Sequence, residues 1–539
     1  MLKAKLLHAA VLVMALLLAA VSVALTADTR NLPGPVDDTY IVFVYAKHVL
    51  HDGIAYFSAR DVRVEGFTSA LDLLVKLPIV AFAGSKAMIV SCAVSCAWLA
   101  TTIVLIWWRT RRYLNNVRCR WFAVAGLAFI ACDPLLAMTG MNSLETPLYV
   151  LTGVAFLFAF AEETRAWVLT TLALLFALSR PEALGAICGL IIVRSLIRRS
   201  VDPRDAIALA APAVVLLVRR LYFGYWAPNT YYAKRSATLE FEIQDGLHYL
   251  QDVARVHRLE AAIVASVVLL TPFLLYRAAR SRSMPLPLVL AGTSVYGLLA
   301  AVYGGGDGYV ELGRFVVLSS LTATLSLFLW ALEFLSSVDV TSTSKRSPWL
   351  SWVVRLALIG FVVIRANVFF ASVPKLQESI AYYNGHRWGL ERGHECDTEV
   401  AMKLEAAFPH ARIGQTDFQR LKFHNDRLAV EDLSGLNDVT IAHRVVPGHV
   451  MWGKFGWDVA LERSYDILFI YDLFRSTNAP TIEDRAGMST DRQLALFNWT
   501  ADKIVFDSYE PASIPMCGVY YNFLVKKGLR AHEPGIVIP

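Results

Sequence analysis

The sequence predicts a polytopic α-helical membrane protein with a C-terminal extracytoplasmic α/β domain. Three observations predict this fold class. First, 56% of the 539 residues are hydrophobic and only 18% are charged, a composition outside the range of soluble globular domains. Second, runs such as LLHAAVLVMALLLAAVSVAL reach the roughly 20 apolar residues that cross a hydrocarbon core. Third, the residues after 371 mix charged side chains with short strand-like runs.

We expect eleven membrane-spanning helices. The first apolar run exceeds the usual h-region of a signal peptide, so we interpret it as an uncleaved span. A further stretch, TSALDLLVKLPIVAFAG, is short and contains Asp72, Lys76 and Pro78; we expect it to lie along the membrane interface. The expected spans are residues 5–25, 87–108, 121–138, 147–161, 167–179, 183–197, 205–219, 259–276, 284–303, 315–337 and 349–371.

The basic loops indicate the orientation of these spans. Lys and Arg are enriched in cytoplasmic loops, so we expect a cytoplasmic N-terminus and an extracytoplasmic C-terminus. In the last span, Arg355 and Arg365 lie towards its two ends, and we expect both side chains to snorkel to the interface. The loops that this orientation places in the cytoplasm are 109–120, 162–167, 194–205, 276–283 and 336–348.

Two domains are expected, a transmembrane domain at 1–371 and an extracytoplasmic domain at 372–539. In the second, the runs YDILFIYDL, DKIVFDSY and GVYYNFLVKKG are rich in β-branched and aromatic residues, which is typical of strands. Cys396 and Cys517 both fall in this region. The sequence leaves open whether they form a disulfide, because it does not give the distance between them.

Composition also argues against two classes of partner. The net charge of +6 comes from Lys and Arg in short loops between apolar runs, so we expect no nucleic-acid binding. Five of the histidines of the C-terminal region, at 394, 410, 424, 443 and 449, are dispersed and lack the spacing of metal ligands. The sequence therefore predicts no metal site, and leaves metal use unknown.

Unusual polar residues gather in the segments predicted to be extracytoplasmic. Asp37 and Asp38 follow the first span in PGPVDD, which also suits a solvated turn. A carboxylate at Glu145 also suits a helix start, because the helix dipole favours an acid there. Ionisable groups near a membrane are often functional or paired. The other candidates are Arg180 and Glu182 in SRPE, the segment APNTYYAK, and Asp307, Glu311 and Arg314 in GGGDGYVELGR.

Together these residues suit sugar transfer from a lipid-linked phosphate. An anionic leaving group needs Arg or Lys to stabilise it, and an acceptor hydroxyl needs a carboxylate to take its proton. In a pair of adjacent acids, one carboxyl can have a raised pKa while its neighbour stays ionised. Such a pair therefore suits the acid–base part of the reaction.

The motifs resemble those of the polyprenyl-phosphate-dependent arabinofuranosyltransferases of bacterial envelopes. The resemblance is strongest to the terminal β-1,2-arabinofuranosyltransferase family of mycobacterial arabinan assembly, which belongs to the GT-C class of membrane glycosyltransferases. It covers most of the chain, although the third glycine and YVEL depart from the family's common form. The matching stretches are VDDTYIVFVYAKHVLHDG, RVEGFTSAL, NSLETPL, SRPEAL, YFGYWAPNTYYAK, GGGDGYVELGRF and LSGLNDVTIAHR.

This resemblance implies the site residues. One of Asp37 and Asp38 is expected to be the catalytic base, and we favour Asp37. Asp438 and His443 are expected in the wall above the site. The residues implied in donor or acceptor binding are Glu65, Thr68, Glu145, Arg180, Glu182, Asn229, Tyr232, Lys234, Asp307, Arg314, Asp438 and His443.

The resemblance also implies the reaction and its partners. We expect an inverting transferase in the bacterial inner membrane, with its site on the extracytoplasmic face. It would use polyprenyl-phospho-arabinofuranose as donor, an envelope glycan (arabinan) as acceptor, and no other cofactor. Alternatives are a GT-C enzyme for another sugar or for a pilin-like protein acceptor, and a transporter of lipid-linked sugars. A transporter should have internal repeats and polar residues near mid-membrane, whereas the polar residues here lie at the outer ends of spans.

Overall fold

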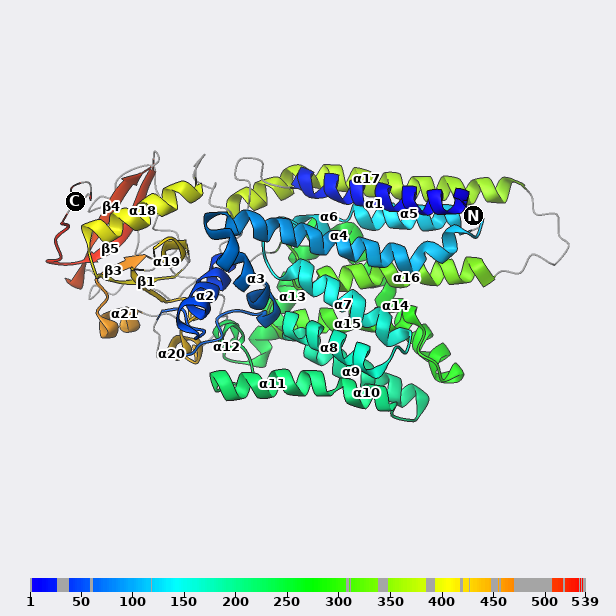
Figure 1. Cartoon of the computed structure of the whole chain (residues 1–539), viewed down its shortest axis with the longest axis horizontal. Coiled ribbons are helices and arrows are strands. Elements are labelled where there is room, and N and C mark those ends of the chain that lie inside the picture. Colours follow the sequence, from blue (N-terminus) through cyan, green and yellow to red (C-terminus); the bar gives the residue numbers. More distant parts are fainter. Residues whose placement is uncertain are drawn as a thin grey trace. The chain divides into compact units, whose positions relative to one another are not determined.

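The chain forms two compact units, which are described separately (Figure 1). The helical unit comprises Met1–Ala27, Ser91–Val215 and Gly246–Ser379, and the sheet unit comprises Asp28–Val90, Leu216–Asp245 and Ile380–Pro539. The computed structural model describes residues 2–26, 38–58, 62–117, 119–306, 310, 312–337, 348–383, 393–416, 420–425, 427–446, 454, 457–469, 507–516, 519–532, 534 and 536.

Helices make up almost all of the described chain before residue 384. The predicted domain boundary at 371/372 lies inside the last of them and stays a prediction. These helices are α1 Leu2–Thr26, α2 Asp38–Asp52, α3 Ala70–Ala83, the 3-10 turn η1 Gly84–Lys86, α4 Ala87–Leu114, α5 Arg120–Ala131, α6 Pro134–Thr139, α7 Thr146–Ala161, α8 Ala166–Ser179, α9 Glu182–Arg198, α10 Pro203–Ala208, α11 Ala210–Phe223, α12 Asn229–Lys234, α13 Leu239–Val256, α14 Arg258–Ser281, α15 Leu286–Tyr303, α16 Val317–Ser337 and α17 Pro348–Tyr383.

The predicted multi-pass character agrees with these helices. Each predicted span falls on one helix or on a consecutive pair, α5 with α6 and α10 with α11. The number of crossings and the interfacial position of 68–84, which contains α3, stay predictions. Among the described residues, six stretches are long and apolar enough to cross a membrane: Ala4–Thr26, Ala70–Leu114, Pro203–Phe223, Arg258–Ser281, Leu286–Tyr303 and Val317–Ser337.

Helix α16 is the central helix of the helical unit. Within its candidate span 72% of the residues are buried, against 22% for α14 at the periphery. It packs closely on α15, because a Cβ added at Gly297 would lie 2.0 Å from the hydroxyl oxygen of Ser319. Small residues allow such close approach where helices meet in a membrane. The helices around α16 are therefore held by close packing.

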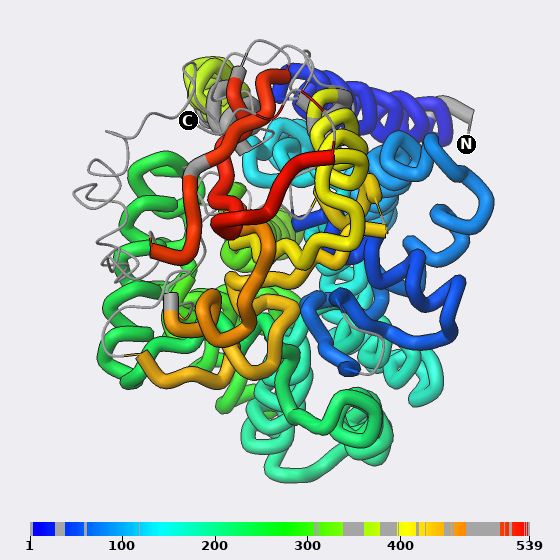
Figure 2. The backbone as a smooth tube through the Cα atoms, turned by 90° about the vertical axis from the view of Figure 1, so that its left-hand side faces the viewer, coloured from blue at the N-terminus to red at the C-terminus, as the bar shows by residue number. Residues whose placement is uncertain are grey.

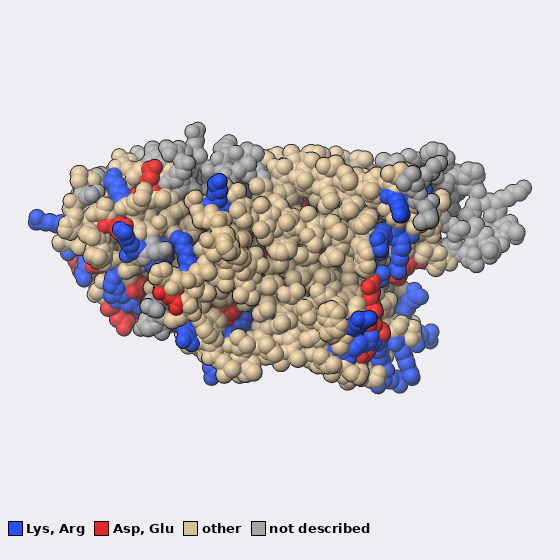
Figure 3. All heavy atoms as spheres, viewed as in Figure 1, with Lys and Arg blue, Asp and Glu red and all other residues tan. Residues whose placement is uncertain are grey.

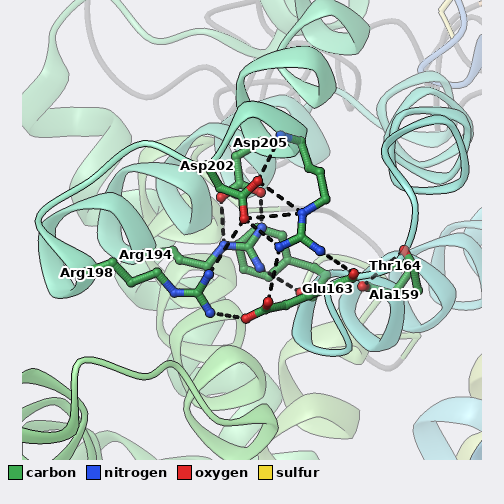
Figure 4. A network of polar contacts seen from close by, with 9 residues as sticks. Ala159, Glu163, Thr164, Arg194, Arg198, Asp202 and Asp205 are labelled. Atoms are coloured by element: carbon green, nitrogen blue, oxygen red, sulfur yellow. Dashed lines mark hydrogen bonds and ion pairs between the residues drawn. The ribbon is translucent and has the colours of Figure 1, made fainter.

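Arginines gather at one end of the helical unit, where several predicted cytoplasmic loops lie together (Figure 3). Arg204 donates to Asp202 at 2.6 Å and to Glu163 at 3.1 Å, and Arg198 also pairs with Glu163 (Figure 4). The hydrogen bond from Arg204 lowers the pKa of Asp202 to about 2. These ion pairs join the α7–α8 loop to α9 and α10. The side of the membrane on which this end lies stays a prediction.

Among its described residues, the sheet unit contains a mixed five-stranded sheet of order β2-β1-β3-β5-β4. Strands β1, β2 and β3 are parallel, and β5 pairs antiparallel with both β3 and β4. Strand β4 forms one edge and contains Pro511 and Pro515; α18 packs beside it (Figure 2). The elements are α18 Gly393–Ala407, β1 Arg412–Gln415, α19 Arg420–His424, β2 Ala429–Asp432, α20 Val439–Ala442, α21 Trp457–Arg463, β3 Ile467–Phe469, β4 Tyr509–Met516 and β5 Val519–Lys526.

The predicted α/β character of this region is confirmed. Two of the predicted runs contain β3 and β5, whereas most of DKIVFDSY lies outside the described residues. The sequence analysis missed β1, β2 and β4. Cys396 is disulfide-bonded, and Cys517, the partner considered in the sequence analysis, lies outside the described residues.

Arg365 does not snorkel, so that expectation was wrong. Its side chain is 1% exposed and lies in the interior of the helical unit. Its guanidinium pairs with Asp133 at 2.8 Å and also with Glu260, and it lies 4.4 Å from the centre of the Phe129 ring. Two acids presented by other helices therefore hold the charge inside the unit. The side chain of Arg355 lies outside the described residues.

Replacing Arg365 with Met should destabilise the protein. The change leaves Asp133 and Glu260 without their cation, and breaking a buried pair costs about 3–5 kcal/mol. Thermal unfolding in detergent measures this, with the exposed Arg280→Met as the matched control. Adding Glu260→Gln to the Arg365→Met chain should restore part of the loss. Equal melting temperatures for Arg365→Met and Arg280→Met would contradict the pairing.

Candidate functional site

The predicted site residues divide between the two units. The sheet unit holds those that lie in the RVEGFTS, APNTYYAK and LSGLNDVTIAHR motifs, together with Asp38. The helical unit holds Glu145, Arg180, Glu182 and Arg314. Asp37 and Asp307 lie outside the described residues.

The segment that follows the two aspartates is a buried helix within the sheet unit. Helix α2 begins at Asp38, whose side chain is half-buried, and the helix dipole favours an acid in the first turn. The amine of Lys47 donates to the backbone oxygen of Phe423 at 2.6 Å. The ring of Tyr40 lies 5.1 Å from that of Phe423. Helix α2 is thereby fastened to α19, which fixes the position of Asp38.

Glu65 is held by an arginine that the sequence analysis missed. The guanidinium of Arg219 donates to both carboxylate oxygens of Glu65, at 2.6 and 3.1 Å, and the two side chains are 6% and 4% exposed. The backbone oxygen of Glu65 accepts from the backbone N–H of Asn229 at 2.9 Å. Because its charge is matched by Arg219, Glu65 suits a positioning role better than proton transfer.

Asn229 joins two of the quoted motifs. Its side-chain amide donates to the backbone oxygens of Gly435 at 2.8 Å and Leu436 at 2.9 Å. Both acceptors lie in the loop 433–438, which follows the carboxyl end of β2. Ligands of parallel α/β sheets commonly bind at this edge of a sheet. Here, Asn229 ties the loop at that edge to the start of α12.

Asp432 gives this loop its shape. The carboxylate is fully buried and accepts from the N–H and hydroxyl of Ser434 and from the N–H and side-chain amide of Asn437, at 2.5–2.9 Å. A buried carboxylate is tolerated when its lone pairs are used in this way. The sequence analysis did not select Asp432, although an Asp two residues before Ser-Gly is typical of a turn.

Gly66 lets the RVEGFTS segment approach this loop. Its N–H donates to the hydroxyl of Tyr45 at 3.1 Å. A Cβ at this position would lie 1.9 Å from the Asn437 side-chain oxygen and 2.6 Å from the Tyr45 hydroxyl. Glycine is therefore required for α2, the Glu65 segment and the loop 433–438 to meet.

Three rings meet beside this junction. The imidazole of His443 lies 4.4 Å from the Tyr232 ring in a stacked arrangement and 4.7 Å from the Tyr225 ring. His443 is exposed and the tyrosines are half-buried. The Nδ1–H of His443 donates to the backbone oxygen of Val439 at 2.8 Å. This bond leaves Nε2 as the ring's acceptor.

Lys454, which the sequence analysis missed, joins α12, which contains Tyr232, to α20, which ends just before His443. Its amine donates to the backbone oxygens of Tyr232 in α12 and Ala442 in α20, both at 2.7 Å. The residue is 6% exposed, and burial lowers its pKa to about 8. Because both acceptors are backbone oxygens, no residue type in the sequence indicates these bonds.

The remaining predicted residues of the sheet unit have local roles. Asp438 caps α20 by accepting from the N–H of Ile441 at 2.9 Å, and its carboxylate also receives Arg463 at 2.6 Å. Thr68 is half-buried just before Ser69, the cap of α3, and Lys234 is the last residue of α12. The structure thus places Glu65, Asn229, Tyr232 and His443 together, with Asp438 bound in a helix cap.

A buried ion pair in α3 explains charges that counted against a span in the sequence analysis. The amine of Lys76 lies 2.6 Å from the carboxylate of Asp72 and 5.2 Å from the centre of the Phe43 ring of α2. Lys76 is 0% exposed and Asp72 6%. These polar residues of α3 therefore lie in the interior of the sheet unit.

In the helical unit, three predicted residues form one cluster. Arg180 donates to Glu145 at 2.5 Å and to Glu182 at 2.9 and 3.3 Å, and it lies over the Phe315 ring at 4.6 Å. Burial lowers the pKa of Arg180, as does the nearby charge of Arg314, but the two carboxylates outweigh both and raise it. The positive charge of Arg180 is therefore largely neutralised by Glu145 and Glu182.

The described residues include no group of three or more His, Cys, Asp or Glu that could hold a metal ion. The sites described above consist of paired charges, amide-to-carbonyl hydrogen bonds and aromatic rings. The aromatic rings suit hydroxyl-rich ligands, whereas the paired arginines are already bound to carboxylates.

Comparison with solved structures supports the fold. The chain matches ArnT from Cupriavidus metallidurans, solved with undecaprenyl phosphate, with a TM-score of 0.50 and 12% identity over 97% of this chain and 99% of that one. It matches the archaeal oligosaccharyltransferase AglB from Archaeoglobus fulgidus, solved with an inhibitory peptide and a dolichol-phosphate, with a TM-score of 0.50 and 11% identity over 98% of this chain and 75% of that one. No family model and no curated protein matches the sequence. The likeness confirms the predicted fold class, a polytopic helical membrane protein of the GT-C type with a sheet-containing C-terminal domain.

Replacing Gly66 with Ala should loosen the junction of α2, the Glu65 segment and the loop 433–438. The new methyl group would overlap Asn437 and Tyr45, and overpacking of this kind costs about 1–3 kcal/mol. Gly189→Ala is the matched control, because nothing lies within 4 Å of a Cβ there and alanine favours a helix by about 0.5–1 kcal/mol. Thermal unfolding of the two variants checks this. Equal stability would contradict the close approach at Gly66.

Stability should depend on pH through Lys454. The pKa of this amine is about 8 in the folded chain and about 10.4 when unfolded, so the unfolded chain binds more protons between these values. The free energy of unfolding contributed by this residue therefore rises with pH across this window. Chemical denaturation of the native protein and of Lys454→Met at pH 7.5 and 10 tests the sign. If the difference in the free energy of unfolding between the native protein and Lys454→Met falls as pH rises, the predicted sign is wrong.

Proposed function

We propose that this chain is a polyprenyl-phosphate-dependent glycosyltransferase. In this proposal it moves an arabinofuranosyl unit to an arabinan acceptor of the cell envelope, on the extracytoplasmic face of the bacterial inner membrane. The observation that carries the lipid-linked donor is the likeness over nearly the whole chain to two proteins solved with undecaprenyl phosphate and dolichol-phosphate. The motif resemblance alone favours arabinofuranose.

The proposed reaction is a single displacement. The acceptor hydroxyl gives its proton to the carboxylate of Asp37 or Asp38, and its oxygen bonds to the anomeric carbon. The bond between that carbon and the phosphate oxygen breaks, and its electron pair leaves with the polyprenyl phosphate. The product therefore has the inverted anomeric configuration.

The charge pairs in the structure narrow the choice of phosphate-binding residues. Arg180 and Arg219 are each bound to carboxylates, which compete with an incoming phosphate. Arg180 and Arg219 therefore suit a positioning role, and the motif resemblance alone supports Lys234 and Arg314 as donor or acceptor contacts. The carboxylates around Arg180 orient its guanidinium, and the Glu65–Arg219 pair holds the segment beside Asn229.

Transfer by purified protein tests the role of the two aspartates. With synthetic polyprenyl-phospho-arabinofuranose and an arabinan oligosaccharide, either Asp37→Asn or Asp38→Asn should lose about 10²–10⁴-fold in kcat and still bind donor. Asp52→Asn, at the other end of α2, is the matched control and should keep activity. Full activity in both Asp37→Asn and Asp38→Asn would overturn the assignment of the base.

Donor and acceptor panels test the finer assignment. Polyprenyl-phospho-mannose and an aminoarabinosyl donor should give little product, and NMR of the arabinan product should show inversion. Transfer of another sugar, or transfer to a pilin-like protein, would correct the substrate. Movement of the lipid across proteoliposomes without any transfer would favour a transporter.

A further inference from the structure

We infer that Tyr225, Tyr232 and His443 form a stacking platform for a sugar ring of the acceptor glycan, and that Lys454 positions it. This inference deepens the proposed function, on which its choice of ligand rests. None of its geometry depends on the helical unit, because all four residues belong to the sheet unit.

The ring arrangement is the first observation that carries the inference. The three ring centres lie 4.4–5.7 Å from one another, and His443 is exposed whereas the two tyrosines are half-buried. The C–H face of a sugar packs on aromatic faces, while its hydroxyls bond to polar groups at their edges. Here those edges carry two phenol hydroxyls and the Nε2 of His443.

The second observation is that hydrogen bonds hold the platform in place, although it lies at the surface. The Nδ1–H bond to Val439 fixes the plane of the imidazole. Lys454 caps the carboxyl ends of both α12 and α20 from within, and helix carboxyl ends favour a cation. Because the rings are already held in place, binding a ligand costs less conformational entropy.

The third observation is the place of the platform in the unit. Asn229, the first residue of α12, bonds to the loop 433–438, and the backbone oxygen of Glu65 receives the N–H of Asn229. The platform is therefore built on the same short helices and loop as the predicted site. A ligand stacked there lies on the edge of that junction.

A membrane-interface role for the same rings is the competing reading, because Tyr and Trp gather at bilayer surfaces. The chain offers a matched control for it. Trp226 lies in the same segment and is 57% exposed, and its ring contacts Arg220 at 5.9 Å. If the segment served only as an interfacial anchor, replacing Trp226 would change glycan binding at least as much as replacing His443.

Glycan binding by the full chain in detergent, without donor, is the test. The probes are an arabinan oligosaccharide and a mannan oligosaccharide, measured by calorimetry. His443→Ala should weaken arabinan binding by about tenfold, His443→Phe should keep much of it, and Trp226→Ala should match the native protein. Lys454→Met should weaken binding while the protein stays folded by thermal unfolding.

Kinetics separate this inference from the proposed function. If the native protein transfers sugar, His443→Ala should raise the acceptor KM about tenfold and leave the donor KM unchanged. Unaltered acceptor binding in His443→Ala, equal losses in Trp226→Ala, or no binding of either glycan by the native protein would each overturn the platform. Glycan binding that depends on His443, without transfer from any donor, would support the platform and overturn the transferase proposal.

Discussion

A charge removed from water has to be paired where it lies, and this requirement determines how the loops and helices of each unit are joined. In the helical unit, Arg365 and Arg180 each connect acids from separate segments. In the sheet unit, the Glu65–Arg219 pair also connects separate segments, and four hydrogen bonds to Asp432 shape the loop that follows β2. Losing one member of such a pair leaves the other buried and uncompensated. The buried charges therefore specify which segments meet, rather than simply adding stability.

The sheet unit shows how short motifs can build a frame around the predicted site residues. The carboxylate of Asp432 shapes a loop, the amide of Asn229 fastens it, and Gly66 leaves the space that both need. The bonds that Asn229 donates end on backbone oxygens, which any residue type can supply. The contacts of Asp432 and Gly66 also involve the side chains of Ser434, Asn437 and Tyr45. The predicted site residues Tyr232 and His443 lie beside this frame, with their rings stacked.

Much of the fold was predictable because long apolar runs are a strong signal, and each predicted span lies on a helix or helix pair. Strands β1 and β2 were missed because four residues are too few to show alternation. The prediction for Arg365 failed because its partners, Asp133 and Glu260, lie far away along the chain. At the site, the quoted motifs pointed to Glu65, Asn229 and His443. Lys454 could not be found, since its partners are main-chain carbonyls.

The edge strand β4 limits how this protein can associate with itself. Pro511 and Pro515 lie opposite Leu524 and Tyr520 of β5, and proline has no N–H to offer a further strand. Exposed edges otherwise recruit strands from other chains and seed aggregates. At this edge the two prolines interrupt the row of donors that such a strand would need. The sheet is therefore protected at this edge against growing into a fibre.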